Sequence, residues 1–140
     1  MRKVSVSIAI CFLLALALSI TGQNQQSPDP LKNIMTQVDP AWTSLQKNLD
    51  SGNASGVATD AARLQRLFAA GERFFTGKNL QQAAGWAKEI ANAADAAAKA
   101  AKDGTVDKNA KTEIGKCQQC HDVYRHKNPD GSFTLKQSKN

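Results

Sequence analysis

Cysteine is scarce in this chain of 140 residues: there are three, and one of them, Cys11, lies in an apolar segment near the N-terminus. The other two, Cys117 and Cys120, are separated by only two residues. A single close pair excludes a framework of several disulfides. Two cysteines are also too few for a four-ligand structural zinc site, unless His121 and one further residue complete it.

Aromatic and acidic residues are also few. Aromatic residues make up 6% of the chain, and 12 Asp and Glu stand against 18 Lys and Arg, which gives a formal net charge of +6. The cations are scattered, without an aromatic-rich basic strand or a groove-reading motif, so no nucleic-acid partner is expected. No grouping of acid, base and nucleophile typical of catalysis is visible, and we do not expect an enzyme.

Residues 1–22 have the order of a secretory signal peptide. Arg2 and Lys3 are followed by an apolar run of 17 residues, and the chain turns polar at Gln23. A retained membrane anchor is the alternative, but this run is at the short limit for a spanning helix. We expect cleavage between Ser19 and Gln23, a periplasmic protein without a stable membrane anchor, and a mature net charge of +4 after loss of the two leader cations.

Four helical stretches are expected after a disordered polar linker at 23–29. In each stretch, apolar residues recur every three or four positions, which is the period of a helix. Asp29 and Pro30 suit the cap and the first position of the first helix, and Pro40 is expected to kink it. The four expected helices span about 30–49, 55–75, 80–102 and 106–126.

The expected fold is all-α, an antiparallel up-down-up-down four-helix bundle over residues 30–128. Short connections make consecutive helices antiparallel neighbours, and the first and last helices then also become antiparallel neighbours. No convincing strand is visible. Residues 129–140 are expected to form a loose polar C-terminal tail.

The run Cys117-Gln-Gln-Cys120-His121 is the pattern that attaches a c-type haem. The spacing places both thiols on one side of a helix, where each can bond one haem vinyl group, and the adjacent imidazole can bind the iron. A redox dithiol usually starts a helix after a strand, whereas this pair lies inside the last helix of a helical chain. A zinc cluster would need further Cys or His ligands, and only His126 remains.

The position of this motif indicates a family. The run Cys117–Arg125, which continues to Tyr124 and Arg125, resembles the C-x-x-C-H-x-x-Y-R pattern of class II cytochromes c, the cytochrome c′ family. The resemblance covers four helices with the motif near the C-terminus. It implies one covalent haem c per chain, with Cys117, Cys120 and His121 as its attachment and proximal ligand. It also implies that Arg125 contributes to cofactor binding, with a solvated surface charge as the alternative. Family members are often homodimers.

Met35 is the expected distal iron ligand. At 1.5 Å per residue it lies about 8 Å into the first helix, and His121 lies about 8 Å before the end of the last, so the two share a level in an antiparallel pair. Methionine and histidine together ligate electron-transfer haems. The alternative is an ordinary core methionine.

The expected function is electron transport in the periplasm by Fe(II)/Fe(III) cycling, with redox proteins of unknown identity as partners. The alternative is a five-coordinate haem protein that binds NO or CO at an apolar distal face. A peroxidase-like activity would need a polar distal group, and the first helix offers none. A docking patch for an anionic partner is expected at four lysines: Lys108, Lys111, Lys116 and Lys127.

Overall fold

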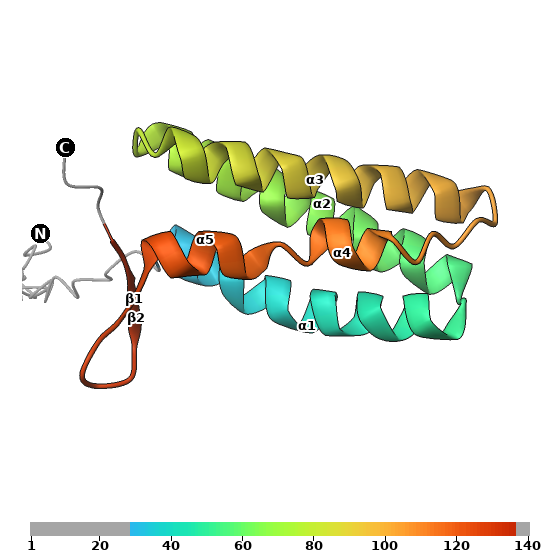
Figure 1. Ribbon diagram of the computed structural model, residues 1–140, viewed down its shortest axis with the longest axis horizontal. Coiled ribbons are helices and arrows are strands. Elements are labelled where there is room, and N and C mark those ends of the chain that lie inside the picture. The colour runs from blue at the N-terminus through green and yellow to red at the C-terminus, as the bar shows by residue number, and fades with distance from the viewer. Residues whose placement is uncertain (1–28, 137–140) are drawn as a thin grey trace, which may run out of the picture.

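The computed structural model of the chain describes residues 29–136, so the expected signal peptide, most of the linker and the last four residues lie outside it. The described chain is mostly helical, with three long helices, two short ones and a two-stranded sheet (Figure 1). The helices are α1 (Pro30–Ser51), α2 (Ala54–Gly77), α3 (Gln81–Lys102), α4 (Ala110–Ile114) and α5 (Cys117–Tyr124), and the strands are β1 (Arg125–Lys127) and β2 (Phe133–Leu135). None of these helices is both long and apolar enough to cross a membrane.

The three long helices begin and end within a few residues of the expected positions. The Asp29 side chain accepts hydrogen bonds from the backbone N–H groups of Leu31 (3.0 Å) and Lys32 (3.5 Å), which satisfies free donors at the start of α1. Gly52 ends α1 in the left-handed region, at φ 69°. Pro40 lies inside α1 without ending it.

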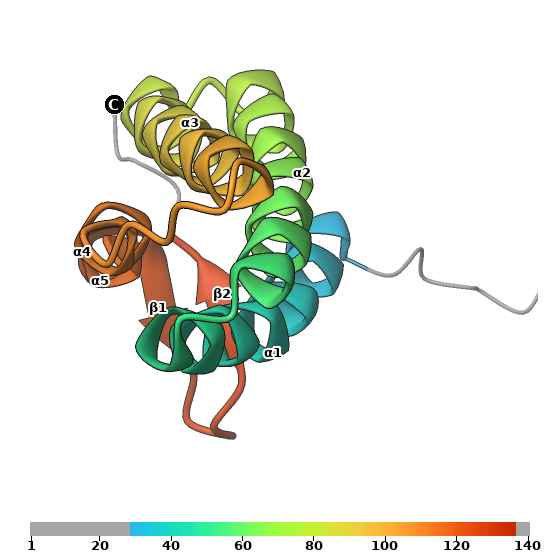
Figure 2. The ribbon, with the colours of Figure 1, turned by 90° about the vertical axis from the view of Figure 1, so that its right-hand side faces the viewer.

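The core lies where the apolar stripes of these helices meet. α2 packs against both α1 and α3, and the three lie side by side (Figure 2). Leu45 of α1 and Leu64 of α2 are completely buried. The facing side of α3 is mostly alanine, whose small side chain lets a neighbouring helix approach closely. Its buried alanines are Ala83, Ala84, Ala87, Ala91, Ala94, Ala97, Ala98 and Ala101.

The expected continuous helix over 106–126 is wrong: the segment contains two short helices, and it leaves the helical conformation after Tyr124. The break lies at Gly115, whose N–H bonds to the carbonyl oxygen of Lys111 (3.1 Å). A β-carbon on Gly115 would lie only 2.6 Å from that oxygen and 3.2 Å from Cζ2 of Trp42. This crowded turn therefore requires glycine, and it separates α4 from α5.

The tail is not loose throughout, because its residues 133–135 form a strand. β2 pairs antiparallel with β1, with Arg125 opposite Leu135 and Lys127 opposite Phe133. Gly131 supplies the positive φ (83°) that the connecting turn needs. The expectation of a mostly helical chain is confirmed, but the expectation of no strand is wrong.

Candidate haem site

The two cysteines and the histidine of the motif lie together on α5, and all three are half-buried. Both thiols are free. The Cys117 Sγ lies 3.9 Å from the carbonyl oxygen of Ile114, a completely buried residue at the end of α4. Cys117 and Cys120 also pack against the core, so the start of α5 is held there while its reactive side chains remain partly accessible.

Burial changes the protonation of all three groups. Burial raises the pKa of the Cys117 thiol. It also raises the pKa of the Cys120 thiol, and the negative charge of an ionised Cys117 raises that pKa further. Burial also lowers the pKa of His121, and the nearby Arg125 cation lowers it further. Near neutral pH the site therefore presents two protonated thiols and an uncharged imidazole, the form of histidine that binds a metal.

The end of α5 is fixed to α3 through Tyr124. This side chain is buried, its hydroxyl donates a hydrogen bond to Oε1 of Gln82 (3.4 Å), and its ring meets that of Trp86 edge to face, with centroids 6.1 Å apart. The carbonyl oxygen of Tyr124 also accepts a hydrogen bond from the N–H of Lys136, just after β2 (2.7 Å). The orientation of α5 is therefore set by both α3 and the hairpin.

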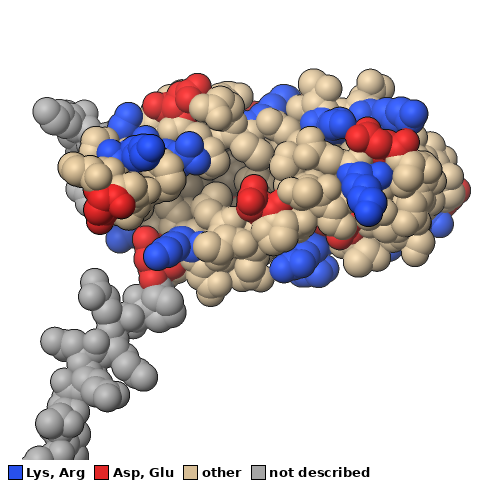
Figure 3. Space-filling model, turned by 90° about the horizontal axis from the view of Figure 1, so that it is seen from below, with Lys and Arg blue, Asp and Glu red and all other residues tan. Residues whose placement is uncertain are grey.

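Met35 is half-buried on α1, and it does not belong to the partly buried apolar side chains that pack against the core. Along the long axis of the molecule, α5 lies at the same end as the first turns of α1 (Figure 1). Seen along that axis, the two segments stand apart (Figure 2). The surface is hollowed in the half of the molecule that carries α5 and the hairpin (Figure 3). The start of α1 and α5 therefore share one end of the molecule, as the expected levels of Met35 and His121 require. The binding of both side chains to one iron stays a prediction.

Arg125 lies at the start of β1 and is exposed, and its guanidinium carbon lies 4.3 Å from the centroid of the Phe133 ring. This distance fits a cation–π contact. A role of Arg125 in cofactor binding also stays a prediction. The motif gave no signal for this contact, because it depends on the unexpected pairing of β1 with β2.

The expected lysine patch is not one free cationic surface. The Lys111 ammonium lies 3.1 Å from both carboxylate oxygens of Asp50, and Lys116 forms an ion pair with Glu113 at 2.8 Å. The hydrogen bond and charge of Glu113 raise the pKa of Lys116. Two of the four lysines are thus engaged with carboxylates, and only Lys127 lies in the hairpin.

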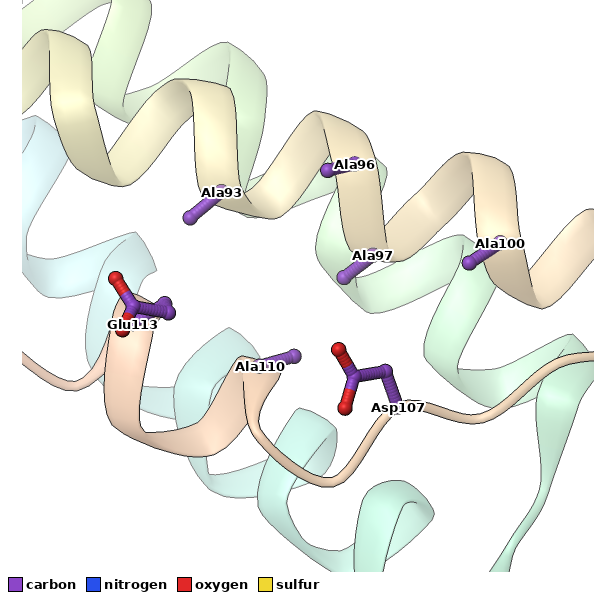
Figure 4. A pocket seen from close by; sticks show the side chains of 7 residues that line it. All are labelled: Ala93, Ala96, Ala97, Ala100, Asp107, Ala110 and Glu113. Atoms are coloured by element: carbon purple, nitrogen blue, oxygen red, sulfur yellow. The ribbon is translucent and has the colours of Figure 1, made fainter.

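A cavity of about 260 Å³ lies between α3 and the segment that carries α4 (Figure 4). Alanine side chains line most of it, the carboxylate of Asp107 points into it, and Glu113 lies at one end. Glu113 is already paired with Lys116, and Asp107 accepts a hydrogen bond from the N–H of Asn109 (2.9 Å). This cavity contains no side chain of the Cys-x-x-Cys-His motif.

Gln82 was not among the residues that the sequence indicated. It is an exposed residue in the first turn of α3, and its only distinction is the hydrogen bond from Tyr124. Nothing in the local sequence marks a glutamine for that role.

Within residues 29–136, no three His, Cys, Asp or Glu side chains converge closely enough to hold a metal ion.

No protein-family model matches this chain, and no curated protein or solved structure matches it either.

Proposed function

We propose that this chain is an exported c-type cytochrome that carries electrons in the periplasm through one covalently bound haem. The observation that carries the proposal is the grouping on α5 of two partly accessible, protonated thiols and an uncharged imidazole, in the order Cys-x-x-Cys-His. The haem, when bound, supplies an iron that exchanges one electron between Fe(II) and Fe(III).

The residues of the site fit that group in their chemistry. Cys117 and Cys120 would hold it by two thioether bonds, and His121 would supply the proximal nitrogen. Because Tyr124 fixes the end of α5 to α3, the imidazole would keep one position in both redox states. A ligand held in place in this way favours electron transfer, since little of the protein has to rearrange.

Met35 is the proposed distal ligand, in a bundle of up-down-up-down topology. Two observations support this ligand. The start of α1 lies at the same end of the molecule as α5, and the Met35 thioether is partly exposed and does not pack into the core. A soft sulfur ligand opposite an imidazole is typical of haems that carry electrons.

The separation of α5 from the start of α1 in Figure 2 favours one alternative, in which Met35 does not reach the iron. The distal position would then be open, and the protein would bind NO or CO at a five-coordinate haem. The two functions share the attachment residues and differ only at Met35.

The absorption spectrum of the purified holoprotein separates them. We expect a low-spin ferric spectrum with the weak far-red band of methionine–iron ligation, and a ferrous spectrum that carbon monoxide barely alters. Replacing Met35→Leu should abolish that band and allow carbon monoxide to bind. A high-spin spectrum that shifts strongly with carbon monoxide in the unaltered protein would instead assign gas binding.

The neighbouring substitution Ile34→Leu is the matched control. Ile34 is also partly buried on α1, but it packs against the core. It should therefore leave the far-red band unchanged. Loss of the band in both variants would mean that packing of α1, and not a bond from Met35, produces it.

A further inference from the structure

Large apolar side chains that are exposed in the described chain occur only next to the candidate haem site. They are Val123 at the end of α5, which is 45% exposed, and Phe133 of β2, which is 51% exposed. Aromatic side chains and arginine are enriched in the surfaces through which proteins dock. The hairpin that carries Phe133 also lies outside the expected four-helix bundle, so the bundle does not explain it.

Two cations share a face of the hairpin with Phe133. Lys127 lies directly opposite it in the sheet, and alternate residues of a strand share a face, so Arg125 lies on the same side. The guanidinium of Arg125 stands over the Phe133 ring. Lys136 follows the strand, and its N–H is tied to the carbonyl oxygen of Tyr124. We call the four residues Arg125, Lys127, Phe133 and Lys136 the hairpin surface.

The cations of the hairpin surface are available to a partner. None of them forms an ion pair with a carboxylate within residues 29–136, whereas Lys111 and Lys116 do. Two acids lie close to these cations along the chain, and both carboxylates accept hydrogen bonds from other residues. Asp122 accepts one from the side-chain amide of Gln118. Asp130 accepts hydrogen bonds from the hydroxyl (2.7 Å) and the N–H (2.9 Å) of Ser132 in the turn. The surface thus combines one apolar ring with a local excess of positive charge.

We propose that the hairpin surface is the docking site for an acidic redox protein, one that presents an apolar centre bordered by carboxylates. Charge complementarity favours this partner, because opposite charges steer two proteins together and an apolar contact then holds them. The hydrogen bond from Lys136 to Tyr124 connects this surface to α5, so a partner docked there would lie beside the haem-bearing helix. The proposal rests on the proposed electron-carrier function.

The test uses the ferrous holoprotein and two oxidants, in stopped-flow experiments at low ionic strength. An acidic blue-copper protein in its Cu(II) form is the docking probe, and it takes one electron from the Fe(II) haem to become Cu(I). A neutral benzoquinone is the second oxidant. It has no charge to be steered, so it reports whether the haem can give up electrons at all.

Two variants alter the surface, and neither replaces a proposed haem residue. Lys127→Gln with Lys136→Gln should slow oxidation by the copper protein by about tenfold, a typical scale for steering by charge. Phe133→Thr keeps a strand-forming residue and should slow it by about threefold through loss of the apolar contact. Both variants should react with the quinone at the native rate.

The control removes two cations from the opposite end of the long helices. Lys47 and Lys102 are exposed near the ends of α1 and α3 (Figure 1). The double variant Lys47→Gln with Lys102→Gln changes the net charge equally but should alter the rate with the copper protein much less. An equal loss of rate in both double variants would mean that net charge acts alone, and the hairpin surface would be rejected.

The remaining outcomes are also decisive. Native rates with both oxidants in the hairpin variants would overturn the docking site and leave the electron carrier intact. A native protein that the quinone cannot oxidise would overturn the proposed function itself. Binding to phosphatidylglycerol vesicles that is lost in Phe133→Thr, with unchanged rates for the copper protein, would assign the surface to a lipid bilayer and contradict the protein partner.

Discussion

The indole ring of Trp42 lies against the backbone of Gly115, so close that a β-carbon on the glycine would stand 3.2 Å from Cζ2 and 3.4 Å from Cη2 of the ring. This contact joins α1 to the turn between α4 and α5. It therefore helps to set where α5, with its cysteines and histidine, begins. A residue far from the motif in the sequence thus takes part in positioning it.

Replacing Gly115→Ala should lower the free energy of unfolding by about 1–3 kcal/mol, the usual cost of inserting a methyl group into a crowded place. The added carbon would meet both the indole and the backbone oxygen of Lys111, which cannot swing away. Urea unfolding of the haem-free protein measures this cost. Gly85→Ala is the matched control, because Gly85 lies in α3 with open space around it, and this change should stabilise the helix by about 0.5–1 kcal/mol. Similar gains in both variants would contradict the crowding at Gly115.

The hydrogen bond from Tyr124 to Gln82 of α3 should be measurable as a coupling energy between the two side chains. Tyr124→Phe removes only the hydroxyl and should cost about 0.5–1.5 kcal/mol of unfolding free energy. In a Gln82→Ala background the same change should cost less, because the acceptor is already gone. Equal costs in the two backgrounds would show that the hydrogen bond at 3.4 Å contributes nothing.

The turn of the hairpin should respond to acid through Asp130. The two hydrogen bonds from Ser132 lower the pKa of this carboxyl below its ordinary value of 3.8. A lowered pKa means that the ionised carboxylate supports the turn above the ordinary value, and that this support is lost as the pH falls through the lowered pKa. The amide proton shift of Ser132 should therefore titrate below about pH 4. In Asp130→Asn that shift should stay flat, and an unchanged titration in this variant would assign it to another group.

The thiols of the haem-free protein should react slowly with iodoacetamide. Burial raises the pKa of both Cys117 and Cys120, so at about pH 8 the folded chain has less of the reactive thiolate than the unfolded chain has. We expect alkylation to be several-fold faster in urea, as followed by mass spectrometry. Equal rates in the folded and unfolded chain would show that these thiols are fully exposed.

The long helices could be predicted because the sequence signals that define them lie within each helix or at its ends. Each has an apolar residue every three or four positions, and α1 also has its cap at Asp29 and its stop at Gly52. The break at Gly115 could not be predicted in the same way. A glycine inside a helical pattern is often tolerated, and here the outcome depends on Trp42, which is distant in the sequence.

The hairpin was missed because its strands are only three residues long, too short to show an alternating pattern. The run 129–131 belongs to the tail that we expected to be loose. Its Asp130-Gly131 pair is common in hairpin turns, and this pair was the one sequence signal for the hairpin.

In the candidate site, the Cys-x-x-Cys-His motif is continuous in the sequence, so its residues could be identified from the sequence alone. The placement of Met35 depends on how helices pack, and no local pattern contains that information.

The most direct test of the central claim is the intact mass of the protein after export and extraction with acidified organic solvent, which removes any haem that is not covalently bound. We predict a mass that corresponds to the chain without its leader plus one haem, with the haem lost in the double variant Cys117→Ala with Cys120→Ala. Cys11→Ala should retain it, because that cysteine lies in the expected leader. A chain exported without covalent haem, in cells that mature other c-type cytochromes, would contradict the account.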